Sequence, residues 1–320
     1  MPAAHETTVR VACFAGVLLA MALAELLAPR RKLALRRPWR WSSNLALVAI
    51  NAALTRIVMP VTAVGAAAFA DARGWGLLHL VELPESLEIL LAVIVLDLVI
   101  YLQHVMFHAV PALWRLHMVH HADLDFDVTT GLRFHTLEIF LSALIKLAAV
   151  LALGPPALAV LAFEVLLNAT SMFNHGNVRL PQRLDRLLRL IVVTPDMHRV
   201  HHSAVSRETN SNFGFNLPWW DFLLGTYRAQ PRAGHEGMTI GLTSPRDERE
   251  VDRLPGMWLL PFRRPSGDGS LMAGPSSADS SPHYAPVPPQ TDSGGSTCVT
   301  AMRPEKQTST SVPSARGRSR

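Results

Sequence analysis

Charged residues are scarce in this chain of 320 residues. They make up 17% of it, whereas hydrophobic residues make up 49% and the mean hydropathy is +0.21. Because a typical soluble domain has about 25% charged residues, the composition argues against an ordinary soluble globular protein. Lysine and arginine outnumber aspartate and glutamate by 30 to 25, for a net charge of +5. High apolarity with a basic balance is typical of a membrane protein with cationic loops, and it argues against a nucleic-acid-binding protein.

Cysteine is also nearly absent. Cys13 and Cys298 lie far apart, the first in an apolar stretch and the second in a polar one. These two residues exclude a disulfide framework, a zinc ribbon and a thiol motif. Histidine is instead abundant, because the chain has 14 histidines and ten of them lie between His104 and His202.

Five apolar stretches are candidates for membrane spans. We therefore predict an all-α integral membrane protein with about four to five transmembrane helices. The Gly154-Pro155-Pro156 turn separates the last two stretches, since no helix continues through it. Arg56 and Pro60 interrupt the second stretch, so its crossing is the least secure. The five stretches are Val9–Ala28, Leu45–Phe69, Leu87–Val110, Leu137–Leu153 and Pro155–Phe173.

The loop charges predict the orientation. The loop Pro29–Ser43 carries six basic residues and no acidic one, whereas Asp71–Ser86 has a net charge of −2. The positive-inside rule places the first loop in the cytoplasm and the second outside. The histidines from His104 to His202 are then expected at the cytoplasmic side, in a helical, histidine-rich cap. The Ala-, Leu- and Arg-rich composition favours a bacterial inner membrane.

Composition also divides the chain into four parts. Residues 1–86 are expected to form membrane anchor helices, 87–228 a candidate functional region that contains most of the histidines, and 229–262 a C-terminal extension. Residues 263–320 are rich in Pro, Gly, Ser and Thr, which predicts a disordered tail. Within the second part, Arg179–Val193 has Leu and Ile at helical spacing opposite arginines. This pattern predicts a helix in the membrane interface, or else an ordinary amphipathic surface helix.

Three histidine motifs predict a metal site. They read HxxxH at His104–His108, HxxHH at His117–His121 and HxxHH at His198–His202. Residues three or four apart share one face of a helix, so each motif presents adjacent imidazoles. Neutral imidazole binds iron, zinc, copper or nickel, and such a cluster can hold one ion or two. A solvated, pH-sensitive histidine surface is the alternative.

Several single residues are candidates for the same site. His135 and His175 lie at the two ends of the predicted hairpin, which returns both to one side; each could instead be an interfacial histidine without a metal. Asp97 and Tyr101 share a helical stripe with His104, so Asp97 can support a ligand or can pair with Arg56 or Lys146. Further candidates for residues that support the ligands are Glu138 and Asn174.

The order of these motifs resembles the fatty acid hydroxylase/sterol desaturase superfamily. The similarity covers about residues 87–227 and includes Asn212-Phe213-Gly214 and Trp220-Asp221-Phe222 after the last motif. Thr136 stands where the family often has proline, and Phe213 where it often has tyrosine. The resemblance implies ten metal ligands, which are His104, His108, His117, His120, His121, His135, His175, His198, His201 and His202.

The resemblance also implies a function. Members of the superfamily are membrane proteins with a histidine-ligated diiron centre on the cytosolic side, and they use O2 and two electrons to hydroxylate or desaturate lipids. The expected cofactors are two iron ions, and the expected partners are a membrane lipid substrate and a separate reductase, cytochrome or ferredoxin. The alternatives are a histidine-rich metal transporter and a metal-binding scaffold without turnover. A transporter should carry its ligands near the bilayer midplane, whereas these histidines lie past the helix ends.

Overall fold

The computed structural model describes residues 3–263. Regular structure in this part of the chain is entirely helical, which confirms the predicted all-α class. Five helical segments are long and apolar enough to cross a membrane, and the chain is an integral membrane protein. The long helices are α1 (Ala3–Leu27), α2 (Arg37–Val58), α4 (Glu85–Ala109), α6 (Thr136–Leu153) and α7 (Ala157–Asn174). The predicted disordered tail begins at residue 263. All of it after that residue lies outside the described part of the chain.

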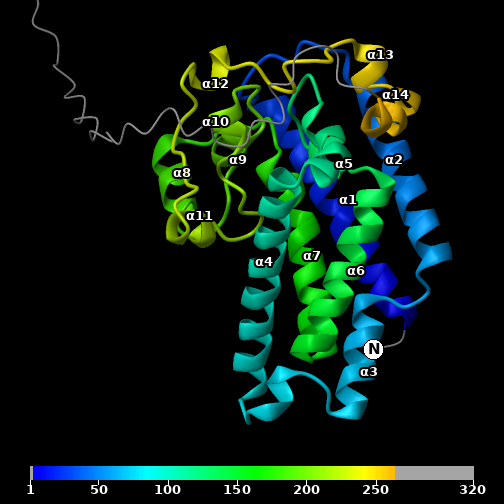
Figure 1. Ribbon diagram of the computed structural model, residues 1–320. Coiled ribbons are helices and arrows are strands. Elements are labelled where there is room, and N and C mark those ends of the chain that lie inside the picture. The colour runs from blue at the N-terminus through cyan, green and yellow to red at the C-terminus, as the bar shows by residue number, and fades with distance from the viewer. Residues whose placement is uncertain (1–2, 264–320) are drawn as a thin grey trace, which may run out of the picture. The chain divides into compact units, whose positions relative to one another are not determined.

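Helix α7 lies among the other long helices and packs on α1 and α4. The short helix α3 (Ala63–Arg73) packs against both α6 and α7 (Figure 1). Ala66 and Ala67 of α3 are buried against Val150 and Phe163, so small side chains bring the helices close together. This packing forms the core of the membrane part.

The second apolar stretch is not one continuous helix. Helix α2 ends at Val58, and α3 begins at Ala63 after a break that contains Pro60. Thr62 caps the new helix, since its Oγ1 accepts a hydrogen bond from the Gly65 N–H at 3.0 Å. The expected span Leu45–Phe69 is thus corrected to two helices, because proline cannot donate to the helical ladder and ends α2. Whether the two helices together cross the membrane stays a prediction.

The hairpin between α6 and α7 turns where the sequence predicts. Gly154 ends α6 with φ of 65°, a left-handed conformation that favours glycine. The loop before α4 packs closely on this turn, since a Cβ on Gly76 would lie 2.3 Å from the Gly154 nitrogen. The start of α6 and the end of α7 both lie at the end of the bundle where α5 and α9 are found (Figure 1).

The loop that follows α5 (Pro111–His121) is held by buried carboxylates. Asp125 accepts hydrogen bonds from the Ala34 and Leu35 N–H groups at 2.9 and 2.7 Å. Asp127 accepts hydrogen bonds from Arg40 and from the Trp41 indole. The basic segment before α2 is thereby fixed over the histidine motifs, because a buried carboxylate is stable only when it is paired.

Helix α1 is attached to the same loops by Glu25, which is 1% exposed. Its Oε1 accepts hydrogen bonds from the N–H groups of Val128 and Asn177 at 2.7 and 2.9 Å. Arg37 donates to its other oxygen at 3.3 Å. One carboxylate therefore links α1 to the chain on both sides of the α6–α7 hairpin.

The amphipathic stretch Arg179–Val193 forms a shorter helix than its pattern predicts. Helix α8 covers Gln182–Leu188. Leu187, Leu190 and Ile191 are exposed, whereas Arg189 turns inward to pair with Asp185 at 2.8 Å. The exposed leucine and isoleucine side chains fit an interfacial position, which stays a prediction.

Candidate metal centre

Three helix ends supply most of the histidines. His104 and His108 lie in the last two turns of α4, and α5 starts at Pro111 directly after it. Proline is favourable at this first position, because its missing N–H has no helical partner there. Helix α9 (Pro195–His201) starts in the same way, with a cap in which Thr194 Oγ1 accepts from the Met197 N–H at 3.3 Å. Proline and the cap thus set where each HxxHH motif begins.

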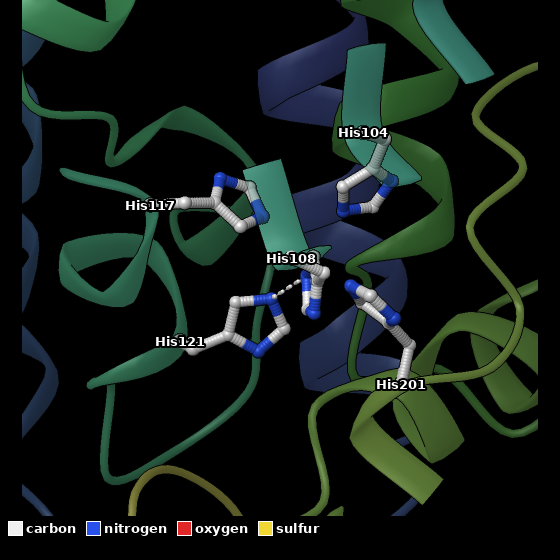
Figure 2. A group of neighbouring side chains, drawn as sticks. All are labelled: His104, His108, His117, His121 and His201. Carbon is white, nitrogen blue, oxygen red and sulfur yellow. Dashed lines mark hydrogen bonds between the residues drawn. The ribbon is translucent and has the colours of Figure 1, made fainter. Parts of the chain in front are cut away.

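The structure brings nine of the ten histidines into two adjacent groups. Within each group the nearest ligand atoms lie within 4.8 Å of one another. The rings of His121 and His202 stack with centroids 4.5 Å apart, so the groups are neighbours. The first histidine group consists of His104, His108, His117, His121 and His201 (Figure 2). The second histidine group consists of His120, His175, His198 and His202.

Each HxxHH motif contributes to both groups. His117 and His121, four residues apart on α5, join the first group, while His120 joins the second. In α9 the division is reversed, since His201 joins the first group and His198 and His202 the second. Side chains three or four residues apart lie on one side of a helix, so all three rings of a motif face the same region. The neighbouring elements then divide these rings between the two groups.

The hydrogen bonds of the first group fix which nitrogen carries the proton. Three of its rings donate Nδ1–H to an oxygen that accepts, which leaves the Nε2 lone pair free. The acceptors are the Phe213 carbonyl for His104 (2.7 Å), Glu138 Oε1 for His117 (2.6 Å) and the Ser211 carbonyl for His201 (2.8 Å). The three Nε2 atoms are buried without a hydrogen-bond partner in the described structure. This pattern is typical of histidines that bind a metal through Nε2.

The second group shows the same arrangement at His175. Its Nδ1–H donates to the Ser171 carbonyl at 2.7 Å, so its Nε2 is a free lone pair. This Nε2 lies 3.2 Å from His120 Nε2 and 3.1 Å from His202 Nε2. Both nitrogens of His198 are buried without a partner. Nitrogens from separate elements thus converge on one small volume.

Burial favours the neutral form of six imidazoles of the centre. Burial, which removes water from the charged form, lowers the pKa of His175 to about 3. Burial and neighbouring rings also hold the pKa well below the usual value for His120, His121, His198, His201 and His202. A neutral ring is the form that binds a metal ion.

The residues present fit two metal ions. Buried polar atoms are normally hydrogen-bonded, so several unpartnered imidazole nitrogens in one place need an explanation. A cation in each group would satisfy them, and a site of nitrogen ligands without thiolate suits iron, zinc, copper or nickel. Helices α5 and α9, which carry most of these histidines, lie above α6 and α7 in Figure 1, and His104 and His108 lie in the last turns of α4.

Comparison with known proteins identifies the region that contains this centre. The model of the fatty acid hydroxylase family matches residues 89–226. The matched region, which is somewhat less than half of the chain, is similar to the fatty acid hydroxylase family. It includes both histidine groups. The resemblance expected from the histidine motifs is confirmed.

Curated relatives carry the names of lipid hydroxylases and monooxygenases. Ornithine lipid hydroxylase OlsE of Rhizobium tropici is 31% identical over 160 residues, which is 50% of this chain and 47% of the relative. Human alkylglycerol monooxygenase is 32% identical over 45% of this chain and 31% of its own length. Human cholesterol 25-hydroxylase is 29% identical over 46% and 55%. The chain thus spans about half or less of the first relatives it matches, and no solved structure matches it.

His135 lies outside both histidine groups. Its Nδ1 accepts a hydrogen bond from the Leu137 N–H at 3.2 Å, and its Nε2 faces the Trp258 carbonyl at 3.3 Å. Nδ1 is the acceptor and caps the start of α6, whereas Nε2 is the donor and contacts the C-terminal extension. Both nitrogens of His135 therefore have partners. Of the two single histidines, the structure places only His175 with the other candidate ligands.

The four supporting candidates occupy different positions in this hydroxylase homologue. Glu138 forms a direct hydrogen bond with a histidine of the first group, His117. The other three hold the segment 211–226. Asp97 accepts from the Trp220 indole at 2.8 Å, the Tyr101 hydroxyl bonds to Thr226 Oγ1 at 2.8 Å, and Asn174 donates to the Phe215 carbonyl at 3.0 Å. Asp97 therefore pairs with neither Arg56 nor Lys146, the alternatives expected from the sequence.

Asp221 is a supporting residue that the candidate set from the sequence omits. It is fully buried and accepts hydrogen bonds from the Phe213 and Gly214 N–H groups at 2.8 and 2.9 Å. The carbonyl of Phe213 in turn orients His104. The Trp-Asp-Phe motif contains Asp221, but its partners are backbone groups, which have no sequence signal. The carbonyl groups of Ser211 and Phe213 could not be found from the sequence for the same reason.

Proposed function

We propose that this protein is a membrane-bound diiron oxygenase that hydroxylates a lipid. The single observation that carries the proposal is the first histidine group, two members of which, His104 and His117, line a largely apolar cavity. The cavity has a volume of about 620 Å³ and is lined by His104, His117 and Glu138 at this end. This volume is in the range of cavities that bind small molecules.

Two iron ions would be held by the nine grouped histidines, where they would supply the activation of O2 for insertion into a C–H bond. In the overall reaction one oxygen atom enters the lipid, and the other leaves as water with two electrons and two protons. A separate reductase, cytochrome or ferredoxin is the expected source of the electrons. The names of the relatives favour hydroxylation over desaturation.

The residues of the chain position the ligands and keep water out. Glu138 holds the proton on His117 Nδ1, and the Phe213 and Ser211 carbonyls do so for His104 and His201. Phe134 stacks on His120 with a centroid distance of 4.5 Å, and Phe215 packs on His104 at 5.5 Å. These aromatic rings place the nitrogens between the hydrophobic cavity and the cap, where a hydrocarbon can approach without bulk water.

We place the histidine groups at the cytoplasmic face of a bacterial inner membrane. The segment Pro29–Ser43, which precedes α2 and includes its first turns, supports this orientation, since it carries six positive charges and no negative one. An electron donor from the cytoplasm would then reach the cap without crossing the bilayer.

Conversion of a lipid extract tests the proposal. The purified protein would be loaded with ferrous iron and supplied with a reductase system and isotope-labelled O2. We expect lipid products that gain one labelled oxygen, and no product from the double variant His120→Ala/His201→Ala, which removes one histidine from each group. His79→Ala, on the opposite side of the bundle, is the matched control and should keep activity. Iron binding without O2 consumption would instead indicate a metal-binding scaffold.

A further inference from the structure

The cavity that reaches the histidines has a second, charged end. Glu164 of α7 pairs with Arg10 of α1 at 2.5 Å and with Lys146 of α6, and Arg10 also pairs with Glu6 at 2.9 Å. These four residues line the cavity. The helices α1, α6 and α7 each contribute to this end, so it is part of the packed bundle.

A fifth charge, Arg56 of α2, lines the same cavity. No carboxylate among residues 3–263 forms an ion pair with it, although every other cation of this end is paired. Three cations therefore face two carboxylates, which leaves a net charge of +1 at this end of the cavity. Thr55 Oγ1, next to Arg56 in the chain, is buried without a hydrogen-bond partner in the described structure.

The charged end is separate from the histidines. Glu138 and Lys146 are eight residues apart on α6, which corresponds to about 12 Å along the helix axis. Asn51 of α2 bonds Thr136 at the start of α6, and Arg56 lies about 7.5 Å further from that level. Between the two ends the wall is largely apolar and includes Ile100, Ile139, Ala143 and Leu167. Its polar residues Gln103 and Ser142 hydrogen-bond to each other at 3.0 Å.

Ionisable groups within membrane spans are costly. Such residues are therefore rare, are normally paired, and mark substrate or ion pathways. Mutual pairing explains Arg10, Lys146, Glu6 and Glu164. It leaves without a partner the buried Thr55 hydroxyl and the guanidinium of Arg56, which is exposed near the end of α2. An anionic ligand in the cavity would satisfy both, because guanidinium binds carboxylate and phosphate oxygens with strong, charge-assisted hydrogen bonds.

We propose that this cavity binds an amphipathic lipid that carries a carboxylate or phosphate group. The anionic group lies at Arg56, beside Arg10 and Lys146, and the hydrocarbon chain runs along the apolar wall toward His104 and His117. The evidence for the binding site comes from the cavity and its lining residues only, and it does not depend on catalysis. The statement that this lipid is the substrate rests on the proposed hydroxylase function, and it predicts that the oxidised carbon lies at a fixed number of carbons from the anionic group.

Binding of three probes with the same alkyl chain tests the proposal without turnover. Radiolabelled hexadecanoate, hexadecyl phosphate and hexadecanol would be equilibrated with the full-length protein in detergent, with no reductant present. We expect both anions to bind at least about tenfold more tightly than the alcohol, since each forms charge-assisted bonds that the alcohol lacks. The difference between hexadecanoate and hexadecyl phosphate identifies the preferred anion, and competition by inorganic phosphate shows whether the chain is needed.

Variants of Arg56 locate the site. Arg56→Gln should remove the preference for the anions while hexadecanol binding stays, and Arg56→Lys should restore most of it. Arg186→Gln, which neutralises an exposed cation on α8 away from the cavity, is the matched control. Equal binding of the acid and the alcohol, or an unchanged preference in Arg56→Gln, would overturn the proposal even if lipid hydroxylation is observed. An anion preference that depends on Arg56 would uphold the binding site even if no oxidation occurs.

Discussion

Glu138 accepts a hydrogen bond from His117 Nδ1 at 2.6 Å, and both side chains are buried. This contact joins the start of α6 to α5 and leaves His117 Nε2 directed toward the other rings of the first histidine group. Glu138 also lines the cavity. One carboxylate therefore belongs to both the ligand framework and the wall along which a substrate would lie.

Replacement of Glu138 should weaken metal binding in the first histidine group. Loss of a residue that orients a ligand typically lowers metal affinity by about 10- to 100-fold. We expect this loss for Glu138→Ala and a smaller one for Glu138→Gln, because the glutamine oxygen still accepts from His117 Nδ1–H. Iron retained per chain after dialysis against increasing chelator is the measurement. Glu88→Ala, in the first turn of α4, is the control, and equal retention by Glu138→Ala would contradict the role.

His135 and His175 should differ in their effect on metal content. Substitution of His175 by alanine should remove the iron of the second histidine group, since it deletes the Nε2 that lies between His120 and His202. His135→Ala should keep both ions and lose some stability, because the residue caps α6. Metal analysis of the two purified variants, with thermal melting, separates these effects. Loss of iron from His135→Ala would show that His135 is a ligand after all.

Stability should depend on pH through Asp221. Burial raises the pKa of Asp221 to about 6, above its usual value of 3.8. The folded protein thus holds this proton more tightly than the unfolded chain, so the contribution is fully present below about pH 4 and is lost as the pH rises to about 6. The slope is about 1.4 kcal/mol per pH unit in that interval.

Thermal melting of the wild type and of Asp221→Asn between pH 4.5 and 7.5 measures this contribution. The difference in stability between the two proteins should shift in favour of the variant as the pH rises. The variant should also be less stable at acid pH by about 1–3 kcal/mol. Its amide group cannot accept from all three donors, which are the Phe213 and Gly214 N–H groups and the Thr226 hydroxyl. A difference that is constant across the interval would contradict the assignment to Asp221.

The orientation can be tested with single cysteines. In a chain with Cys13 and Cys298 changed to serine, Leu80→Cys lies in the loop before α4 and Ala233→Cys in the cap. Both positions are exposed, Leu80 by 79%. We expect a membrane-impermeant thiol reagent to label Leu80→Cys in intact cells and Ala233→Cys only after permeabilisation. Labelling in the reverse order would place the histidine groups outside the cytoplasm.

Much of the architecture could be predicted from local patterns. The apolar stretches and the Gly-Pro-Pro turn predicted the α6–α7 hairpin, since helix length and proline act within a few residues. The break between α2 and α3 is harder to predict. Pro60 indicates an interruption, but the apolar residues on both sides of it favour a single span.

The histidine motifs predicted a cluster but not its division. His117 and His120 belong to different groups, although they are three residues apart. The spacing puts both on one side of α5, and only the position of α9 decides which neighbours each ring meets. His135 fits the order of the superfamily motifs, yet its ring faces Trp258 because the C-terminal extension packs there.

The sequence by itself determined the helical class, the membrane character and the histidines that approach one another within a helical turn. These features follow from hydrophobic length and helical periodicity, which are local properties of the chain. Tertiary structure decided the two groups, the carbonyl groups that orient His104 and His201, and the cavity with Arg56 in its wall. Each of these depends on contacts between residues distant in sequence, where backbone groups and packing leave no pattern in the order of amino acids.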